Sequence, residues 1–205
     1  MEMKLGMIDY GRGNLRSVIN ACKVLGHDPT LITKPEELET FTHLIFPGQG
    51  AFGDCMDSLH RLGLAKALRE WIAAGKPYFG ICVGYQLLFE ASEESPGTAG
   101  LGVFAGTVRR FTSSHLKIPH MGWNATVHTK EHSPYWVGFD ETPYFYFVHS
   151  YYPAEVDLGI VSATCDYGDE TFCAAIEQGT LFATQFHPEK SQTVGLQILK
   201  NFSEL

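Results

Sequence analysis

The sequence predicts an α/β fold with a mostly parallel central sheet flanked by helices, and with additional antiparallel strands in the C-terminal half. Strand-like and helix-like patterns alternate within residues 4–89, which is typical of parallel strands joined by helices. Residues 103–186 instead contain several strand-like stretches with few helical patterns between them. The length of 205 residues suits a single domain, residues 1–205, that buries a substantial core.

The N-terminal half contains three strand-to-helix units. Strands are predicted where short apolar runs meet turn-forming residues, at 4–8, 30–33, 43–46 and 78–81. Helices are predicted where apolar residues follow helical spacing, at 15–25, 64–72 and 84–89. The strand at 43–46 ends in Pro47-Gly48-Gln49-Gly50, a loop rich in turn-forming residues. A second sharp turn begins at Cys82.

The C-terminal half reads mainly as strands. They are predicted at 103–111, 123–128, 143–148, 160–163, 173–177 and 181–186, several of them antiparallel. Gln178-Gly179 indicates a hairpin between the last two strands. Ser191 is a candidate cap for a final helix whose apolar residues extend from Val194 to Phe202.

Composition and charge exclude several classes of protein. The formal net charge of −8 provides no basic field for a nucleic-acid backbone, so no nucleic-acid partner is expected. The apolar run within residues 1–9 is too short for a signal segment or a membrane span, which leaves the cytoplasm as the expected location. Five cysteines without a CxxC pair indicate reduced thiols. His128 and His132 have no nearby third ligand, so neither a metal nor another cofactor is expected.

Cys82 lies between two glycines at a predicted passage from strand to helix, in Gly80-Ile81-Cys82-Val83-Gly84. The glycines leave room for a strained turn, and the helix N-terminus directs N–H groups toward the sulfur, which favours a thiolate. The N–H group of Val83 is a candidate donor to an oxyanion. The pattern predicts a cysteine nucleophile, and a small buried cysteine beside packing glycines is the alternative. The other four cysteines lack this pattern and are predicted to be structural.

Among the nine histidines, His187 is the strongest candidate for the base that a cysteine nucleophile needs. It follows the predicted strand at 181–186, and Pro188 favours an extended backbone at His187. The side chains of His187 and Glu189 are then predicted to point to the same side, so that Glu189 orients the imidazole. The alternative is that His-Pro-Glu is an ordinary connection between a strand and the last helix.

Two segments together resemble the triad class of glutamine amidotransferases: residues 80–89 (GICVGYQLLF) and residues 183–191 (ATQFHPEKS). Further segments resemble one family within that class, the glutaminase subunits of imidazole glycerol phosphate synthases. These segments are residues 9–14 (DYGRGN), 47–52 (PGQGAF), 121–124 (MGWN) and 147–151 (FVHSY). Their order and spacing extend over nearly the whole chain. The resemblance implies a flavodoxin-like fold of three layers.

The resemblance also implies the chemistry. Cys82 would attack the carboxamide of glutamine, His187 would shuttle the proton, and Glu189 would orient His187. A glutamyl thioester would form and then be hydrolysed. The residues implied to line the glutamine pocket are Gly48, Gln49, Gly50, Val83, Gln86, Ser150 and Tyr151, with the loop at Gly48 and Gln49 supplying part of the oxyanion hole. This loop departs from the family pattern, which more often has valine where this chain has Gln49.

A cyclase subunit is the partner that the resemblance implies. In the family this separate, barrel-shaped protein forms a heterodimer with the glutaminase and receives its ammonia. The cyclase joins the ammonia to a phosphoribulosyl formimino aminoimidazole carboxamide nucleotide, which gives imidazole glycerol phosphate and an aminoimidazole carboxamide ribotide in histidine biosynthesis. The residues that match positions facing the cyclase are Asn14, Trp123, Tyr146 and Lys190. Their alternative roles are core aromatics for the two rings and a solvated charge for the lysine.

Three other functions are compatible with parts of this pattern. The same triad could serve anthranilate, aminodeoxychorismate or pyridoxal phosphate synthesis, although the MGWN and FVHSY segments speak against these. A cysteine peptidase would use the same nucleophile and base. A non-catalytic α/β binding subunit remains a third alternative, because a fold alone never establishes chemistry. A dinucleotide site at residues 11–14 is weaker, because the third glycine of that motif is missing.

Overall fold

The computed structural model describes residues 3–113, 115–139 and 142–205, and its largest sheet has eight strands. The strand order is β2-β1-β3-β4-β13-β12-β11-β8. Strands β2 to β13 of this order pair in parallel, and β12, β11 and β8 are added by antiparallel pairing. The strands are β1 (Leu5–Ile8), β2 (Thr30–Ile32), β3 (His43–Phe46), β4 (Tyr78–Ile81), β8 (Val127–His128), β11 (Val161–Tyr167), β12 (Glu170–Gln178) and β13 (Leu181–Thr184). The predicted α/β class with antiparallel additions is confirmed.

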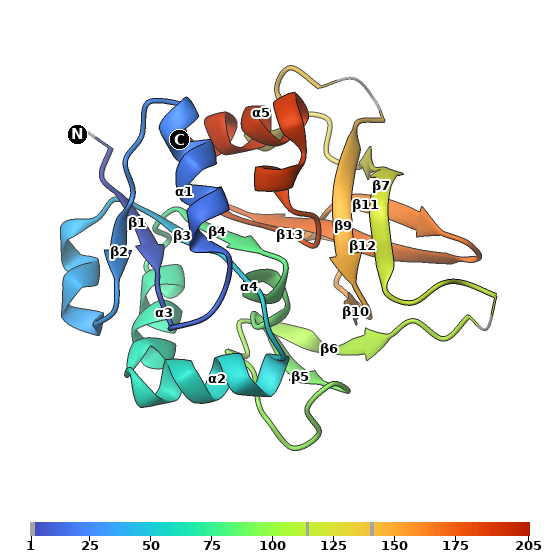
Figure 1. Cartoon of the computed structure of the whole chain (residues 1–205), viewed down its shortest axis with the longest axis horizontal. Helices are drawn as coiled ribbons and strands as arrows, with labels where there is room; N and C mark the ends of the chain where they lie inside the picture. The colour runs from blue at the N-terminus through green and yellow to red at the C-terminus, as the bar shows by residue number, and fades with distance from the viewer. Residues whose placement is uncertain (1–2, 114, 140–141) are drawn as a thin grey trace.

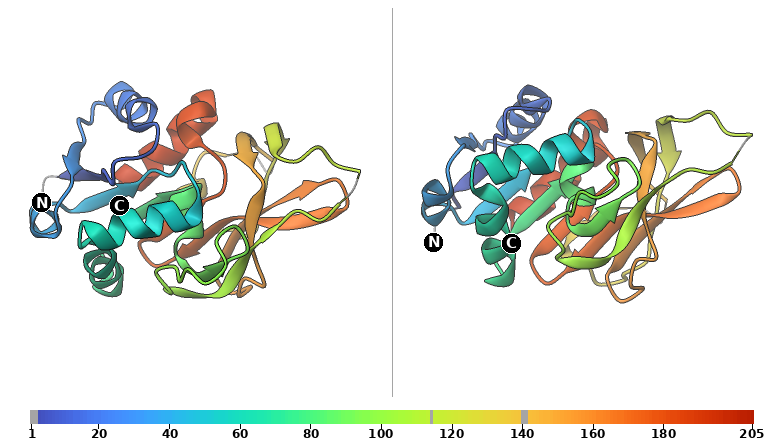
Figure 2. Two further views of the ribbon diagram at one scale, coloured as in Figure 1. Left: turned by 60° about the horizontal axis from the view of Figure 1, so that its bottom comes forward. Right: turned by 90° about the horizontal axis from the view of Figure 1, so that it is seen from below.

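Helices cover both faces of the large sheet and complete a three-layer arrangement (Figure 1). The helices α1 (Leu15–Val24) and α5 (Gln192–Ser203) lie on one face, and α2 (Phe52–Arg61) and α3 (Leu64–Ala73) lie on the other. The second pair lies in front of the sheet when the molecule is seen from below (Figure 2). Strands β1, β3, β4 and β13 are buried at every residue, as expected for strands covered on both faces. No helix in the described ranges has the length and apolar character needed to cross a bilayer.

Two smaller sheets, formed mainly by the C-terminal half, are present among the described residues. One contains β10 (Tyr151–Ala154), β6 (Phe104–Arg110) and β5 (Phe89–Ser92), and the other pairs β7 (His120–Ala125) with β9 (Tyr144–His149). The single strand predicted at 123–128 is therefore wrong, because the chain changes partners at Thr126. Residues before Thr126 pair with β9, whereas Val127 and His128 pair with β11. The predicted hairpin at Gln178-Gly179 is confirmed by the antiparallel pairing of Gln178 with Leu181.

Two helices differ from the sequence prediction. The helix predicted at 84–89 is only α4 (Val83–Gln86), because residues 89–92 form β5 and pair with β6. No local pattern singles out α2, whose N-terminus is capped from a distant loop. A carboxylate oxygen of Glu94 accepts the N–H of Phe52 at 2.7 Å, and the hydroxyl of Ser95 accepts the N–H of Gly53 at 2.9 Å. Within the described ranges, 3-10 helices also occur at η1 (Pro35–Thr40), η2 (Pro134–Trp136) and η3 (Pro188–Lys190).

Candidate active site

Cys82 occupies a sharp turn between β4 and α4. Its φ of 52° lies in the left-handed region, where a residue with a side chain is strained. The N–H of Cys82 donates to the carbonyl oxygen of Thr184 at 2.7 Å, which anchors the turn to the end of β13. Val83 begins the helix that follows, and the first N–H groups of a helix have no intrahelical partner. The turn therefore has the geometry of a nucleophile elbow.

Three glycines let the backbone around this turn pack without side chains. A methyl group on Gly84 would overlap the carbonyl oxygen of Phe46, and one on Gly80 would lie 2.7 Å from the carbonyl oxygen of Gly84. A methyl group on Gly48 would lie 2.5 Å from the carbonyl oxygen of Ile81. The backbone of the loop that contains Gly48 therefore packs directly on the backbone of the turn at Cys82.

The register of the sheet brings His187 to the same edge as the turn. Parallel pairing of β4 with β13 aligns Ile81 with Thr184, so the residues that follow the two strands meet. The Nδ1 atom of His187 lies 2.8 Å from Oε1 of Glu189, and the two side chains are only 2% and 3% exposed. His187 itself is extended, but Glu189 lies in the 3-10 helix η3. The 3-10 turn at Pro188–Lys190 therefore brings the side chains of His187 and Glu189 together. The predicted extended backbone from 187 to 189 is wrong.

The imidazole of His187 is held in its protonated form by its surroundings. Burial would lower the pKa of His187, but the charge of Cys82 and a hydrogen bond with it oppose this effect. Together with the hydrogen bond and the charge of Glu189, they raise the pKa of His187 to about 10. An imidazolium between a sulfur and a carboxylate can hold a proton and deliver it to a bound molecule.

A cavity of about 350 Å³ opens at this edge of the sheet and is lined by Cys82 and His187. Every residue that the resemblance assigns to the glutamine pocket also lines it: Gly48, Gln49, Gly50, Val83, Gln86, Ser150 and Tyr151. Lys190, predicted at the partner interface, lines the cavity as well. The fold therefore brings the 47–50 loop, the nucleophile turn and the β9–β10 connection together.

Sequence patterns do not indicate four further residues of the cavity wall, which are Glu94, Pro119, Val148 and His149. Glu94 follows β5 and reaches the cavity because its carboxylate also caps α2. Val148 and His149 belong to the FVHSY segment, and this segment is the signal in the sequence that could have found both. Besides Cys82 and His187, the cavity wall has one carboxylate, from Glu94, and one ammonium group, from Lys190.

The peptide groups of Gln49 are bound by a hydroxyl from a distant loop. The Tyr10 hydroxyl accepts the N–H of Gln49 and donates to its carbonyl oxygen, each at 3.2 Å. Burial, followed by the charge of Cys55, raises the pKa of Tyr10 well above its usual value, so this hydroxyl keeps its proton. In this conformation the N–H group of Gln49 donates to Tyr10 and is not free to donate to a molecule in the cavity.

Three of the four predicted interface residues lie together. Trp123 and Tyr146 are opposite each other on β7 and β9, with ring centroids 6.2 Å apart. The ammonium of Lys190 lies 5.6 Å from the ring centroid of Tyr146. Asn14 is exposed and has a local role, because its side chain accepts the N–H of Ser17 at the start of α1.

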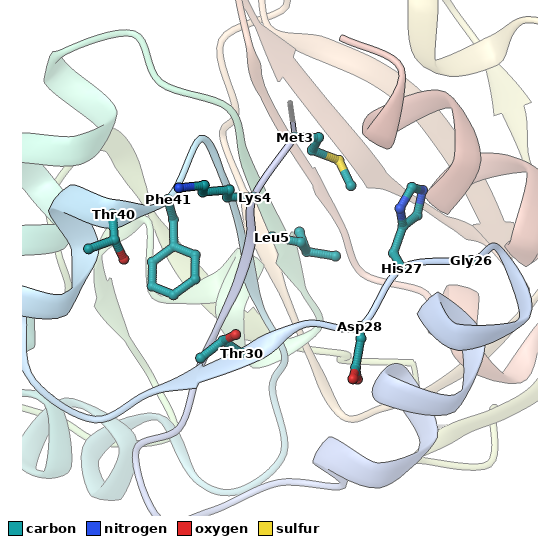
Figure 3. Close-up of a pocket in the computed structure, with 9 residues that line it drawn as sticks. All are labelled: Met3, Lys4, Leu5, Gly26, His27, Asp28, Thr30, Thr40 and Phe41. Atoms are coloured by element: carbon teal, nitrogen blue, oxygen red, sulfur yellow. The ribbon is translucent and has the colours of Figure 1, made fainter. Parts of the chain in front are cut away.

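A larger cavity of about 730 Å³ lies at the opposite edge of the sheet (Figure 3). It is lined by Leu5 and Thr30, which begin β1 and β2, and by Lys4, His27 and Asp28. Cys82 and His187 instead follow the carboxyl ends of their strands. The larger cavity is therefore remote from Cys82, and the smaller one is the candidate active site.

Comparison with known proteins identifies the family. The pattern of the family described as glutamine amidotransferase class-I matches residues 6–204. The chain belongs to the class-I glutamine amidotransferases. The imidazole glycerol phosphate synthase subunit HisH of Acinetobacter baylyi is 45% identical over 98% of each chain, which places this amidotransferase among the HisH subunits.

Two further similarities extend this assignment. The imidazole glycerol phosphate synthase hisHF of Schizosaccharomyces pombe is 45% identical over 98% of this amidotransferase, which matches 38% of that longer protein. A crystal structure of a glutamine amidotransferase has a TM-score of 0.76 at 23% identity, covering 98% of this chain and 97% of the other. At this sequence identity, the similarity to the crystal structure shows a shared fold only.

A pair of buried histidines borders the cavity of the amidotransferase. Nδ1 of His120 lies 3.2 Å from Nε2 of His149, and Nδ1 of His149 lies 2.8 Å from the carbonyl oxygen of Tyr151. Burial lowers the pKa of His120 to about 4. Burial also lowers the pKa of His149 to about 3, although its bond to Tyr151 opposes the shift. Both rings are therefore neutral at physiological pH.

This pair is expected to make the amidotransferase sensitive to acid. Below a pH of about 6.5 these two histidines bind protons in the unfolded chain but not in the folded one. The free energy of unfolding therefore decreases as the pH is lowered. From pH 7 to pH 5 the two histidines together contribute a decrease of about 4 kcal/mol, measurable by urea unfolding. His149→Gln can still donate to Tyr151 and accept from His120, and should remove about half of this decrease. An unchanged pH dependence in this variant would contradict the assignment.

The helix α5 packs closely on the turn that carries Glu189. The hydroxyl of Ser191 donates to the carbonyl oxygen of His187 at 2.7 Å and accepts the N–H of Tyr146 at 2.9 Å. Ser191 is the N-cap residue of α5, as predicted, but its side chain makes no capping bond to the helix. Its hydroxyl instead links the backbone of His187 to the backbone of Tyr146 in β9 through two hydrogen bonds.

Gly195→Ala is expected to disturb this segment of the amidotransferase. A methyl group on Gly195 would overlap the carbonyl oxygen of Pro188. We expect the free energy of unfolding to fall by about 1–3 kcal/mol and the turnover of glutamine to fall about 10-fold or more. Urea unfolding and steady-state kinetics test this. Helix propensity alone predicts a gain in stability of about 1 kcal/mol, so a gain would contradict the expected overlap.

Proposed function

We propose that this chain is the glutaminase subunit of an imidazole glycerol phosphate synthase in histidine biosynthesis, with Cys82, His187 and Glu189 as its catalytic residues. The observation that carries the proposal is a cysteine on a strained turn beside a buried imidazole whose pKa is raised to about 10. Both line a cavity of about 350 Å³, large enough for an amino acid. Membership among the HisH subunits favours this acceptor over anthranilate, aminodeoxychorismate or pyridoxal phosphate synthesis.

The proposed reaction proceeds in two steps. The sulfur of Cys82 attacks the carboxamide carbon of glutamine, and the N–H of Val83 stabilises the oxyanion that forms. The imidazolium of His187 gives its proton to the departing nitrogen, so ammonia leaves and a glutamyl thioester remains. Neutral His187 then removes a proton from water, which attacks the thioester. Glutamate is released, and the thiolate and the imidazolium are restored.

The charges at the cavity suit the backbone of a free amino acid. The Glu94 carboxylate can pair with the α-ammonium group of glutamine, and the Lys190 ammonium can pair with its α-carboxylate. Within this proposal Gly48, Gly50, Ser150 and Tyr151 shape the remaining wall of the pocket. A residue within a peptide has neither a free α-ammonium group nor a free α-carboxylate, because both groups form amide bonds. The two charges at the cavity therefore argue against a cysteine peptidase.

The outer face of β7 and β9 is the proposed docking surface for a cyclase subunit. Met121, Trp123 and Tyr144 are large hydrophobic residues on this face and are 60%, 44% and 58% exposed. Exposed aromatic residues of this kind are common at the centre of protein interfaces. The N–H of His187 donates to the carbonyl oxygen of Tyr146 at 2.9 Å, so a partner bound to β9 would touch the support of the catalytic base.

Two further features belong to the proposal. Residues 1–205 would act as one glutaminase domain, because the proposed catalytic residues follow two neighbouring strands of a single sheet. The cytoplasm is the proposed location, because its reducing conditions keep thiols such as the five buried cysteines free.

A glutaminase assay tests this function. We expect little glutamate release by the isolated chain, because the N–H of Gln49 is bonded to Tyr10 and does not face an oxyanion. Addition of the cyclase subunit with its nucleotide should raise turnover about 100-fold, the usual effect of one oxyanion donor. Equal turnover with and without the liganded cyclase would contradict this coupling. Absence of glutamate release under both conditions would contradict the function itself.

A further inference from the structure

A chain of buried amides leads from the β9–β10 connection to the sulfur of Cys82. The Nε2 atom of Gln86 donates to the carbonyl oxygen of Tyr151 at 2.9 Å and to Oε1 of Gln185 at 3.0 Å. The Nε2 atom of Gln185 in turn donates to Sγ of Cys82 at 3.6 Å. Gln185 is completely buried, and Gln86 is nearly so. The sulfur therefore has a second polar neighbour besides His187.

The direction of each bond in this chain follows from one backbone group. The carbonyl oxygen of Tyr151 can only accept, so Gln86 must present its nitrogen to it. The same nitrogen faces the amide of Gln185, which must therefore offer its oxygen there. The nitrogen of Gln185 is then left to point at Cys82. Neutral His149 also donates to the carbonyl oxygen of Tyr151, at 2.8 Å, and helps to fix this group in place.

Gln185 lies outside the substrate cavity. It is absent from the cavity wall, whereas Gln86, Cys82 and His187 all line it. Gln185 is the residue after Thr184, whose carbonyl oxygen accepts the N–H of Cys82, so strand β13 supports both the backbone and the sulfur of the nucleophile. A residue in this place acts on the reaction through Cys82 and does not touch glutamine.

We propose that Gln185 is a positioning residue for the nucleophile, whose side-chain N–H group holds the sulfur of Cys82 toward the cavity and favours its thiolate form. A thiolate accepts a hydrogen bond more strongly than a thiol does, so this donor supports the charged state that attacks glutamine. It also fixes the direction of attack, and small displacements of reacting atoms are costly. This inference rests on the proposed glutaminase function for its kinetic consequence, but the contact with Cys82 can be tested without it.

Gln185→Met is the most direct test, because methionine keeps the length of the side chain and removes the N–H donor. In the full chain with the liganded cyclase, we expect kcat for glutamine hydrolysis to fall about 10- to 100-fold. KM should stay within about twofold, because Gln185 does not line the cavity. Alkylation of Cys82 by iodoacetamide at neutral pH, followed by peptide mass spectrometry of the full chain, should slow by a similar factor, because the thiolate is the reacting form.

A second variant and a control keep the test decisive. Gln185→Glu retains the oxygen that accepts from Gln86 but places a carboxylate beside the sulfur, and it should lose at least as much alkylation rate as Gln185→Met. Asn201→Leu removes another buried amide, which donates to the carbonyl oxygens of Tyr135 and Val137. This control should lower stability while kcat and the alkylation rate of folded protein remain near those of the parent chain.

The outcomes separate this inference from the proposed function. Wild-type kcat and alkylation in either folded Gln185 variant would overturn the positioning role, as would an equal loss in Asn201→Leu. If the parent chain releases no glutamate with the liganded cyclase, the proposed function fails. The alkylation rates would still decide whether Gln185 governs the sulfur of Cys82.

Discussion

Cys82→Ala is expected to lower glutamine-dependent synthesis by the complex about 10⁴-fold or more, because no thioester can form without the sulfur. Synthesis from added ammonia should continue at the parent rate, since ammonia enters after the step that needs Cys82. The strained turn should persist, because alanine has no larger side chain and the surrounding glycines are unchanged. Both rates can be measured on the same complex by supplying either glutamine or an ammonium salt.

A second cysteine provides the control for this prediction. Cys22 is buried in α1, where burial raises its pKa to about 12, and it does not line the cavity. Cys22→Ala should cost some stability and leave both nitrogen sources usable. Retention of glutamine-dependent synthesis by Cys82→Ala would instead favour the non-catalytic binding subunit.

Glu189→Gln is expected to reduce kcat for glutamine hydrolysis by about 10²- to 10⁴-fold with a smaller effect on KM. The carboxylate of Glu189 accepts the Nδ1–H of His187 at 2.8 Å and stabilises the imidazolium, and an amide keeps the shape but removes the charge. The pKa of His187 should fall in the variant, because one of the contributions that raise it is lost. Steady-state kinetics and titration of His187 by nuclear magnetic resonance would measure the two effects.

A carboxylate outside the site controls for the loss of charge. Glu177 accepts a hydrogen bond from Ser162 at 3.0 Å within the β11–β12 pair. Glu177→Gln should affect stability more than turnover. A decrease in kcat of less than tenfold for folded Glu189→Gln would show that Glu189 does not orient the base.

Local sequence patterns are sufficient for those parts of this molecule that depend on neighbours in the chain. The buried runs of β1, β3 and β4 have strand character without help from distant residues. The two glycines around Cys82 indicate a tight turn because only a residue without a side chain fits there. Pro188 similarly restricts the backbone of His187, which is extended in the structure.

The remaining features depend on contacts that only the folded chain provides. The cap of α2 comes from Glu94, which is 42 residues away from Phe52. Gln185 meets Cys82 because β13 pairs in parallel with β4, and that strand order cannot be read from spacing alone. The end of α4 at Gln86 is set by the pairing of β5 with β6, which outweighs the helical pattern up to residue 89.

The interlocked glycines at the nucleophile turn also limit how such a chain can evolve. Gly48, Gly80 and Gly84 each occupy space that a side chain would need to take from backbone atoms. Replacement of one of these glycines cannot be compensated by a smaller side chain at a neighbouring residue, because the atoms in contact belong to the backbone. Substitutions near Cys82 are therefore better tolerated at residues such as Gln49, which lines the cavity and is not a glycine packed against backbone. Residues of the cavity wall can therefore change and alter substrate binding, while the glycines of the turn at Cys82 are retained.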